Sequence, residues 1–211
     1  MANNIAITSG SGTTLKTTDN AGVHTPHHNI DVIASGSNFI GAVKTRFFAA
    51  AAATVTRPAN TTAYSVNDAV SNNAAAGSVT PISFSVSNVS DDPVSLERVR
   101  ILSTDTGLVG QTLRMFFYQT DPSASSGIVG GDNAAFSTKQ GTFIGTMSGT
   151  LRAFSDGAGG VLTPDEGSRI ITNPTGGAQT VFGLLQTLTA WTPSANSTTI
   201  VPTVEGFQGR A

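Results

Sequence analysis

The segment from Pro81 to Val89 alternates apolar and polar side chains. Its even positions from Ile82 to Val86 are apolar, and its odd positions from Ser83 to Ser87 are serine. A period of two is typical of a β-strand, whereas an α-helix would repeat its apolar positions every 3.6 residues. The pattern predicts a strand with one face against a core and the other in solvent.

The segment from Val94 to Ser103 has the same alternation with one change of phase. Val94 and Leu96 occupy even positions, whereas Val99 and Ile101 occupy odd positions. One extra residue in a strand restores the inward face after such a slip. We therefore expect a β-bulge near Glu97 and Arg98.

The rest of the chain contains further short extended segments that end at Pro, Gly or Asn, and no convincing amphipathic helix. Aromatic residues on both sides of the segment from Thr112 to Gln119 predict a central or interface strand. The Gly-rich segment from Ser155 to Pro164 is expected to be an exposed loop, and Phe47 to Ala53 a buried strand. The remaining expected strands are 29–34, 54–56, 142–147, 150–154, 169–172, 180–189 and 198–204.

This arrangement predicts an all-β protein, namely a β-sandwich that is jelly-roll-like, with an extended N-terminal arm. An immunoglobulin-like sandwich is the alternative. Residues 1–28 are polar and Gly-rich with few apolar anchors, so they form the expected arm. Residues 29–211 form the expected sandwich domain.

Charged residues make up only 11% of the 211 residues, compared with about a quarter in an ordinary soluble domain. The formal net charge of −2 disfavours direct binding of nucleic acid. No cysteine is present, which excludes disulfides and thiolate chemistry. The first residues lack a secretory pattern, and no apolar run reaches the roughly 18 residues of a membrane helix. We expect no membrane association.

Five segments resemble virion structural proteins of tailed bacteriophages. The first is TVTRPANTTAYSVNDAV, from Thr54 to Val70, which resembles a TRPADTTAY segment of that family. The others are GVHTPHHNID at Gly22–Asp31, TLRMFFY at Thr112–Tyr118, DNAAF at Asp132–Phe136, and VFGLLQTLTAWTPSA at Val181–Ala195. The ordered set spans about two thirds of the chain.

This resemblance implies a structural component of the particle, most like a head decoration (cement) protein, and no enzyme. Such a protein would be made in the host cytoplasm and would lie on the head surface of the virion. Its implied partners are the major capsid protein and other copies of itself, as a homotrimer. A tail or neck component is the alternative within the same family.

Two groups of residues are candidate contacts with capsid or neighbouring subunits. The first is His24, His27 and His28 in the arm. Their spacing would suit a helical metal site, but Pro26 interrupts a regular helix, so no metal site is expected. Protonation near the ordinary histidine pKa of about 6.5 would make such a contact sensitive to pH.

The second group consists of arginines. We expect Arg57 to pair with a carboxylate such as Asp68, because planar guanidinium contacts fix the register of neighbouring segments. The remaining arginines form an expected basic face toward the capsid, with solvated strand positions as the alternative. These are Arg98, Arg100, Arg114 and Arg152.

The motifs of several enzyme classes are missing from the sequence. There is no Gly-x-Ser-x-Gly elbow, no phosphate-binding Gly-x-x-x-x-Gly-Lys, and no histidine outside the arm. We therefore expect no enzyme, no catalytic residues and no cofactor. A glycosidase with paired carboxylates is the alternative that the sequence leaves open, because its two acids need only be near in space. A carbohydrate-binding adhesin domain is a further alternative, with Tyr64, Tyr118 and Trp191 as candidates for stacking on sugars.

Overall fold

The structure is a computed structural model that describes residues 17–20, 23–26, 46–124, 130–135, 142–167, 169–174 and 177–209. The chain divides into two units, Met1–Ala42 and Val43–Ala211. In the first unit, β1 (Thr17–Asn20) pairs antiparallel with β2 (Val23–Pro26). The predicted boundary after residue 28 and the predicted strand at 29–34 lie outside the described residues.

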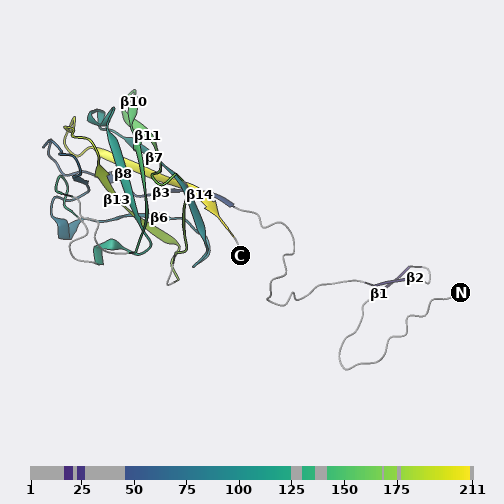
Figure 1. Ribbon diagram of the computed structural model, residues 1–211. Helices are drawn as coiled ribbons and strands as arrows, with labels where there is room; N and C mark the ends of the chain where they lie inside the picture. Colours follow the sequence, from purple (N-terminus) through teal and green to yellow (C-terminus); the bar gives the residue numbers. More distant parts are fainter. Residues whose placement is uncertain are drawn as a thin grey trace. The chain divides into compact units, whose positions relative to one another are not determined.

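The second unit is built from strands, and its described helices are three short 3₁₀ turns. The predicted all-β fold is therefore confirmed (Figure 1). The strands are β3 (Arg46–Ala51), β4 (Val55–Thr56), β5 (Ala69–Val70), β6 (Ile82–Ser85), β7 (Val94–Ser103), β8 (Thr112–Tyr118), β9 (Phe143–Thr150), β10 (Arg152–Phe154), β11 (Gly157–Pro164), β12 (Ile170–Thr172), β13 (Thr180–Thr187) and β14 (Thr199–Gln208). The 3₁₀ turns are η1 (Ala76–Ser78), η2 (Thr106–Leu108) and η3 (Pro122–Ala124).

Eight of these strands have the connectivity of a jelly roll. In chain order they are β3, β6, β7, β8, β9, β11, β13 and β14. The first pairs with the last, the second with the seventh, the third with the sixth, and the fourth with the fifth. This is a long antiparallel ribbon wrapped into two sheets, β3-β14-β7-β11 and β6-β13-β8-β9, so the predicted jelly-roll-like sandwich is confirmed. The C-terminal end of β11 also pairs with β9 and joins the two sheets.

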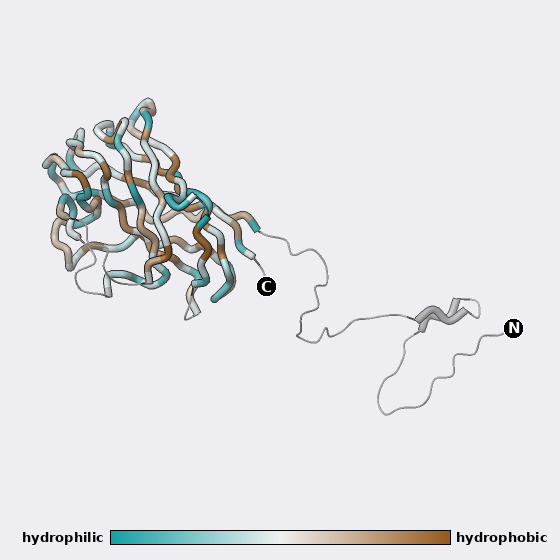
Figure 2. The backbone as a smooth tube through the Cα atoms, in the orientation of Figure 1, coloured by the Kyte–Doolittle hydropathy of each residue, from teal (hydrophilic) through white to brown (hydrophobic). Residues whose placement is uncertain are grey.

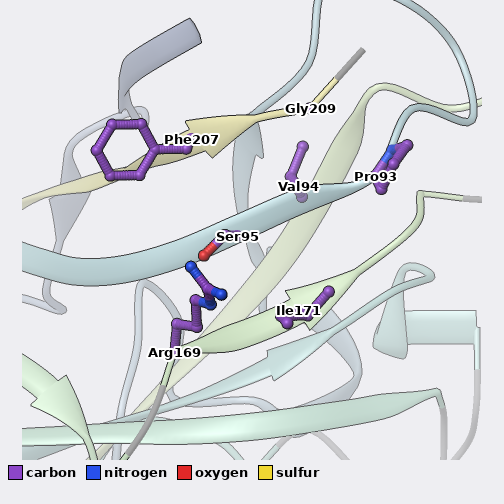
Figure 3. Close-up of a pocket in the computed structure, with 7 residues that line it drawn as sticks. All are labelled: Pro93, Val94, Ser95, Arg169, Ile171, Phe207 and Gly209. Atoms are coloured by element: carbon purple, nitrogen blue, oxygen red, sulfur yellow. The ribbon is translucent and has the colours of Figure 1, made fainter. Parts of the chain in front are cut away.

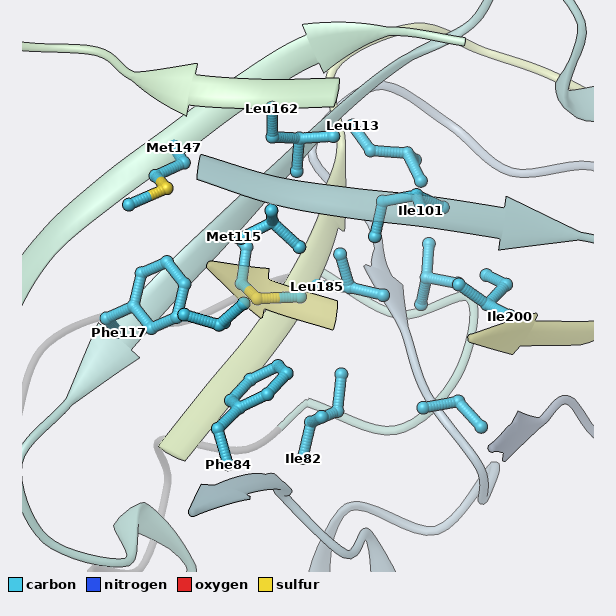
Figure 4. Close-up of a cluster of buried hydrophobic side chains, with 14 of the residues drawn as sticks. Ile82, Phe84, Ile101, Leu113, Met115, Phe117, Met147, Leu162, Leu185 and Ile200 are labelled. Carbon is cyan, nitrogen blue, oxygen red and sulfur yellow. The ribbon is translucent and has the colours of Figure 1, made fainter. Parts of the chain in front are cut away.

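The main core lies between the two sheets, and apolar and polar positions alternate along the strands (Figure 2). The strand predicted from Pro81 to Val89 is β6, and its Ile82 and Phe84 are buried while Ser83 and Ser85 are exposed. Phe84 packs against Phe117 of β8, with ring centroids 6.1 Å apart (Figure 4). The alternation read from the sequence therefore identifies the inward face correctly.

The bulge expected in β7 is present at Glu97. Arg98 pairs with Glu205 of β14, whereas Leu96 pairs with Gly206, so Glu97 is the extra residue. Leu96 and Val99 are both fully buried on either side of it. The bulge keeps the apolar face of β7 toward the core along its whole length.

Two sequence predictions of local structure are wrong. The segment from Ser155 to Pro164 is not an exposed loop, since it contains the central strand β11. Its glycines permit close packing: a Cβ atom on Gly157 would lie 1.9 Å from the carbonyl oxygen of Ser103, and the Phe154 ring lies against Gly159. The strand at Phe47 exists as β3, but it is an edge strand with mostly exposed side chains and is not buried.

Candidate functional site

Arg57 lies inside the protein, at the centre of a buried polar network. Its side chain is fully buried, and its Nη2 lies 3.4 Å from Oδ2 of Asp132, which is also buried. Its Nε donates to the hydroxyl oxygen of Tyr64, and that hydroxyl donates to Oδ1 of Asp132 at 2.5 Å. The guanidinium also lies over the Tyr64 ring, 4.7 Å from its centroid. Tyr64 in turn stacks on Trp191, with ring centroids 4.6 Å apart.

Burial and the Asp132 carboxylate both raise the pKa of Tyr64. The phenol therefore keeps its proton at neutral pH and acts as a donor to Asp132. Oδ1 of Asp132 accepts a further hydrogen bond, from the backbone nitrogen of Ser71 at 2.9 Å. A buried ion pair of this kind is maintained only when the remaining hydrogen-bonding capacity is also satisfied.

The network continues from Arg57 to Asp105, a second buried carboxylate. Nη1 of Arg57 donates to Oγ1 of Thr198 at 3.3 Å, and Thr198 donates to Oδ2 of Asp105 at 3.0 Å. Oδ1 of Asp105 accepts from the backbone nitrogens of Gly107 and Ser194. Asp105 thus connects the turn η2 to the segment that precedes β14. We call the whole set, Arg57, Tyr64, Asp105, Asp132, Trp191 and Thr198, the Arg57 network.

The predicted ion pair of Arg57 is therefore present, but the predicted partner is wrong. Asp68 instead accepts a hydrogen bond from the backbone nitrogen of Ser65 within its own turn. The actual partner, Asp132, lies 75 positions away in sequence, so no local pattern indicates it. Because Arg57 is buried, it is not part of an exposed contact surface, which corrects its assignment as a contact residue.

Three segments of the bacteriophage resemblance meet in the Arg57 network. Arg57 and Tyr64 belong to the TRPANTTAY segment, Asp132 begins the DNAAF segment, and Trp191 belongs to the AWTPSA segment. Their joint burial shows that these residues hold the loops of the domain together. In this chain, these four buried residues therefore have a structural role.

The outward side of the sheet β3-β14-β7-β11 exposes large apolar side chains. Phe47, Phe207 and Ile171 lie in one row, because Phe207 pairs with both Phe47 and Ser95, and Ser95 pairs with Ile171. Cross-strand partners project from the same side of a sheet. We call this outward side, together with that of β10, which pairs with β11, and of β12, which pairs with β7, the exposed face. Its large apolar residues are Phe47, Leu102, Phe154, Val161, Ile171 and Phe207, each more than 40% exposed.

Two of the predicted contact arginines lie together on the exposed face. Arg98 and Arg100 of β7 each donate from Nε to one oxygen of Glu205 on β14, both at 2.5 Å. Glu205 is buried, whereas the two arginine side chains are 53% and 49% exposed. One carboxylate therefore fixes two guanidinium groups in the middle of an apolar surface, and the set carries an excess positive charge.

The outward side of the other sheet is different, because most of its aromatic residues are buried or partly buried, although Phe143 of β9 is 50% exposed. Phe116 and Tyr118 of β8 form a second apolar cluster with Val79 and with Leu184 of β13. Burial raises the pKa of Tyr118 to about 12. The two sheets thus differ in exposure: one presents apolar side chains to solvent, and the other covers most of them.

Arg114 does not join the other arginines. It lies on β8 in the second sheet, where its Nε donates to Oδ2 of Asp165 at 3.1 Å. Although partial burial of Asp165 opposes it, hydrogen bonds from Ser148 and Thr146, together with Arg114, lower the pKa of that carboxyl below its ordinary value. Arg152 pairs in register with Gly159 and so lies on the exposed face. The predicted single basic face is therefore divided between two sheets.

The histidine group is only partly described. His24 lies in β2 directly opposite Asp19 of β1 in the antiparallel register. His27 and His28 lie outside the described residues. The predicted contact through these histidines stays a prediction.

Two shallow grooves lie along the exposed face. The larger, of about 410 Å³, runs beside Phe207, Ile171 and Arg169 (Figure 3). The smaller, of about 190 Å³, lies between Leu102 and Phe154. The aromatic residues considered for sugar stacking do not line either groove, since Tyr64, Tyr118 and Trp191 are all buried. Packing in the protein interior, and not sugar binding, accounts for them.

Within the part of the chain that the structure describes, no three His, Asp or Glu side chains gather into a group that could hold a metal ion. In the same part of the chain, no helix is long and apolar enough to cross a membrane.

Comparison with protein-family models finds no family that matches the sequence. A search of curated proteins likewise finds no significant match. The described strands thus form a jelly-roll sandwich, and the outward side of its β3-β14-β7-β11 sheet exposes a group of large apolar residues.

The carboxyl of Glu205 makes stability depend on pH. Although burial acts to raise its pKa, hydrogen bonds from Arg98 and Arg100 lower it below the ordinary 4.5. A lowered pKa in the folded state contributes stability above the ordinary value, and this contribution is lost as the pH falls through the lowered one. We expect the difference in unfolding free energy between the native chain and Glu205→Gln to shrink as the pH falls from about 6 to about 3.

Denaturant unfolding at a series of pH values measures this difference. Glu166→Gln is the matched control, because Glu166 is exposed and has no ion pair among the described residues. A difference for Glu205→Gln that stays constant over this pH range would contradict the prediction.

Proposed function

We propose that this chain is a structural protein of a tailed-bacteriophage virion, a decoration (cement) protein that binds the outer surface of the head and stabilises it. The observation that carries the proposal is the exposed face. Six large apolar side chains and two ion-paired arginines share one rigid sheet surface. Exposed apolar patches of this kind mark protein-binding sites, and aromatic residues and arginine are enriched there.

The identity of the proposed partner is inferred from the resemblance of five segments to bacteriophage virion proteins. In the proposal the partner is the major capsid protein, and the chain itself assembles as a homotrimer on the head surface after synthesis in the host cytoplasm. No enzyme activity and no nucleic-acid contact are part of this function.

The proposed mechanism is stabilisation by mass action. A protein that binds the assembled lattice but not separated subunits shifts the equilibrium toward the intact shell, by an amount that grows with its concentration relative to Kd. Three linked copies would bind with a higher effective concentration than one, so modest single contacts would still give slow release. A rigid β-sandwich suits this role, because its binding face needs little reordering on contact.

The test uses purified protein and empty expanded heads of the phage that encodes it. We expect the protein to co-sediment with heads at saturable occupancy and to raise the temperature at which the heads disrupt. Electron microscopy of labelled particles then separates placement on the head from placement on the tail or neck. Absence of binding to heads, or label found on tails alone, would overturn the proposal. Binding of the isolated protein to a glycan array would favour the adhesin alternative.

A further inference from the structure

Arg98 and Arg100 of the exposed face have Nη hydrogen-bond donors that no described residue accepts from. Each uses only its Nε to contact Glu205, and no hydrogen bond joins their Nη atoms to any described residue. Glu205 balances one of the two positive charges, so one remains. Because Glu205 is buried beneath them, the two side chains are held in place before any partner arrives. Fixed guanidinium groups of this kind bind a planar anion such as a carboxylate with little loss of conformational freedom.

The surroundings of this pair restrict what the anion can belong to. Along the same sheet, Val161 pairs with Arg100 from the β11 side, and Leu102 follows two positions further along β7. Phe207 lies on β14 two positions beyond Glu205, on the same outward side. A free inorganic anion or a nucleic-acid backbone would leave these apolar side chains in water. A protein surface would cover them and gain the free energy of apolar burial.

A second copy of the chain is a poor occupant of the same surface. A two-fold contact centred on this site would bring the arginine pair of one copy toward the arginine pair of the other. Like charges placed opposite each other across an interface repel, which disfavours such a contact. Glu97, the neighbouring carboxylate on β7, accepts a hydrogen bond from Ser95, and the ion pairs of both arginines are with Glu205. The remaining positive charge is therefore open to a negative group of a partner.

We propose that the Arg98–Glu205–Arg100 set is the specificity site of the exposed face, and that it receives a carboxylate side chain flanked by apolar residues on a partner protein. The proposal deepens the proposed function, on which the identity of that partner as a capsid protein rests. The apolar residues supply contact area, and the arginine pair selects where an acidic residue must lie.

The experiment uses a probe that is independent of phage heads. The probe is a short capped peptide in which one aspartate lies between leucines, and its control replaces the aspartate by asparagine. Side-chain Nε–H signals of Arg98 and Arg100 in the ¹⁵N-labelled full chain report binding by NMR. We expect saturable shifts with the aspartate peptide and an affinity at least about 10-fold weaker for asparagine, since a charge-assisted bond is replaced by a neutral one.

The variant Arg98→Gln/Arg100→Gln lacks these two side-chain signals, so binding to it is followed through the backbone amide signals of β7 and β14. Loss of the peptide-induced shifts of those amides in this variant, with an otherwise unchanged backbone spectrum, would support the site. Equal affinity for both peptides would overturn the inference. Saturation by inorganic phosphate at lower concentration than by the aspartate peptide would also overturn it, as would shifts that depend on protein concentration alone. If the peptide binds but heads do not, the proposed function fails and the carboxylate site stands; if heads bind but the peptide does not, the carboxylate site fails alone.

Discussion

Replacing Asp132 by alanine is expected to lower the free energy of unfolding by about 3–5 kcal/mol. The substitution leaves the buried guanidinium of Arg57 without a counter-ion and removes the acceptor of the Tyr64 hydroxyl. A buried charge that loses its partner costs far more than the pair contributes, because the dehydrated charge is no longer compensated. Thermal and denaturant unfolding of the full chain measure the loss.

Asp68→Ala is the matched control, since Asp68 is the partner that the local sequence predicts. It accepts one hydrogen bond at a turn, so its loss is expected to cost about 1 kcal/mol. Should Asp132→Ala fail to fold, Asp132→Asn gives a milder test that retains the shape of the side chain. The double variant Arg57→Met/Asp132→Leu lacks both charges, so we expect this variant to be more stable than Asp132→Ala. Equal losses for Asp68→Ala and Asp132→Ala would contradict the central role of the Arg57 network.

The second large effect is expected in head binding. Leu102→Gln and Ile171→Gln place an amide at two apolar positions of the exposed face, which are 52% and 66% exposed. In a dry interface, each change loses apolar burial and leaves a polar group without a partner, at a cost of at least about 2 kcal/mol, or about 30-fold in Kd. Co-sedimentation with heads measures the change.

The two positions should act independently. Ile171 pairs with Ser95, and Leu102 lies seven residues further along β7. The paired strand β14 spans the same interval in six residues, which is roughly 20 Å at the rise of a strand. Effects at such a distance usually add, so the double variant is expected to bind about 1000-fold more weakly. Val66→Gln is the matched control, because Val66 is 53% exposed in a turn outside the sheet. Normal unfolding temperatures with normal head binding in the double variant would exclude the exposed face as the docking surface.

The local alternation of side chains predicted several strands and the inward face of β6. It identified β6 and its buried residues Ile82 and Phe84. It also located the bulge at Glu97, because an extra residue in one strand shifts the apolar period by one position. It failed at β11, where glycines were interpreted as loop signals although they allow strands and the Phe154 ring to approach closely.

Which residues meet across the sandwich was decided by the tertiary structure alone. The sequence indicated that Arg57 pairs with a carboxylate. That carboxylate is Asp132, because folding brings together two loops that lie far apart in the chain. Exposure was decided in the same way: β3 has an apolar pattern similar to that of a core strand, yet it lies at a sheet edge with Phe47 in solvent.

The physical reason is the range of the forces involved. Side-chain alternation and turn formation depend on residues that are neighbours in sequence, so the amino-acid sequence alone predicts them. Ion-pair partners and exposed faces depend on which strands become neighbours in space, and the wrapping of the jelly-roll ribbon determines that. The sequence alone therefore determined the β-sandwich, and the three-dimensional arrangement decided which of its arginines is buried in the structure and which are available to a partner.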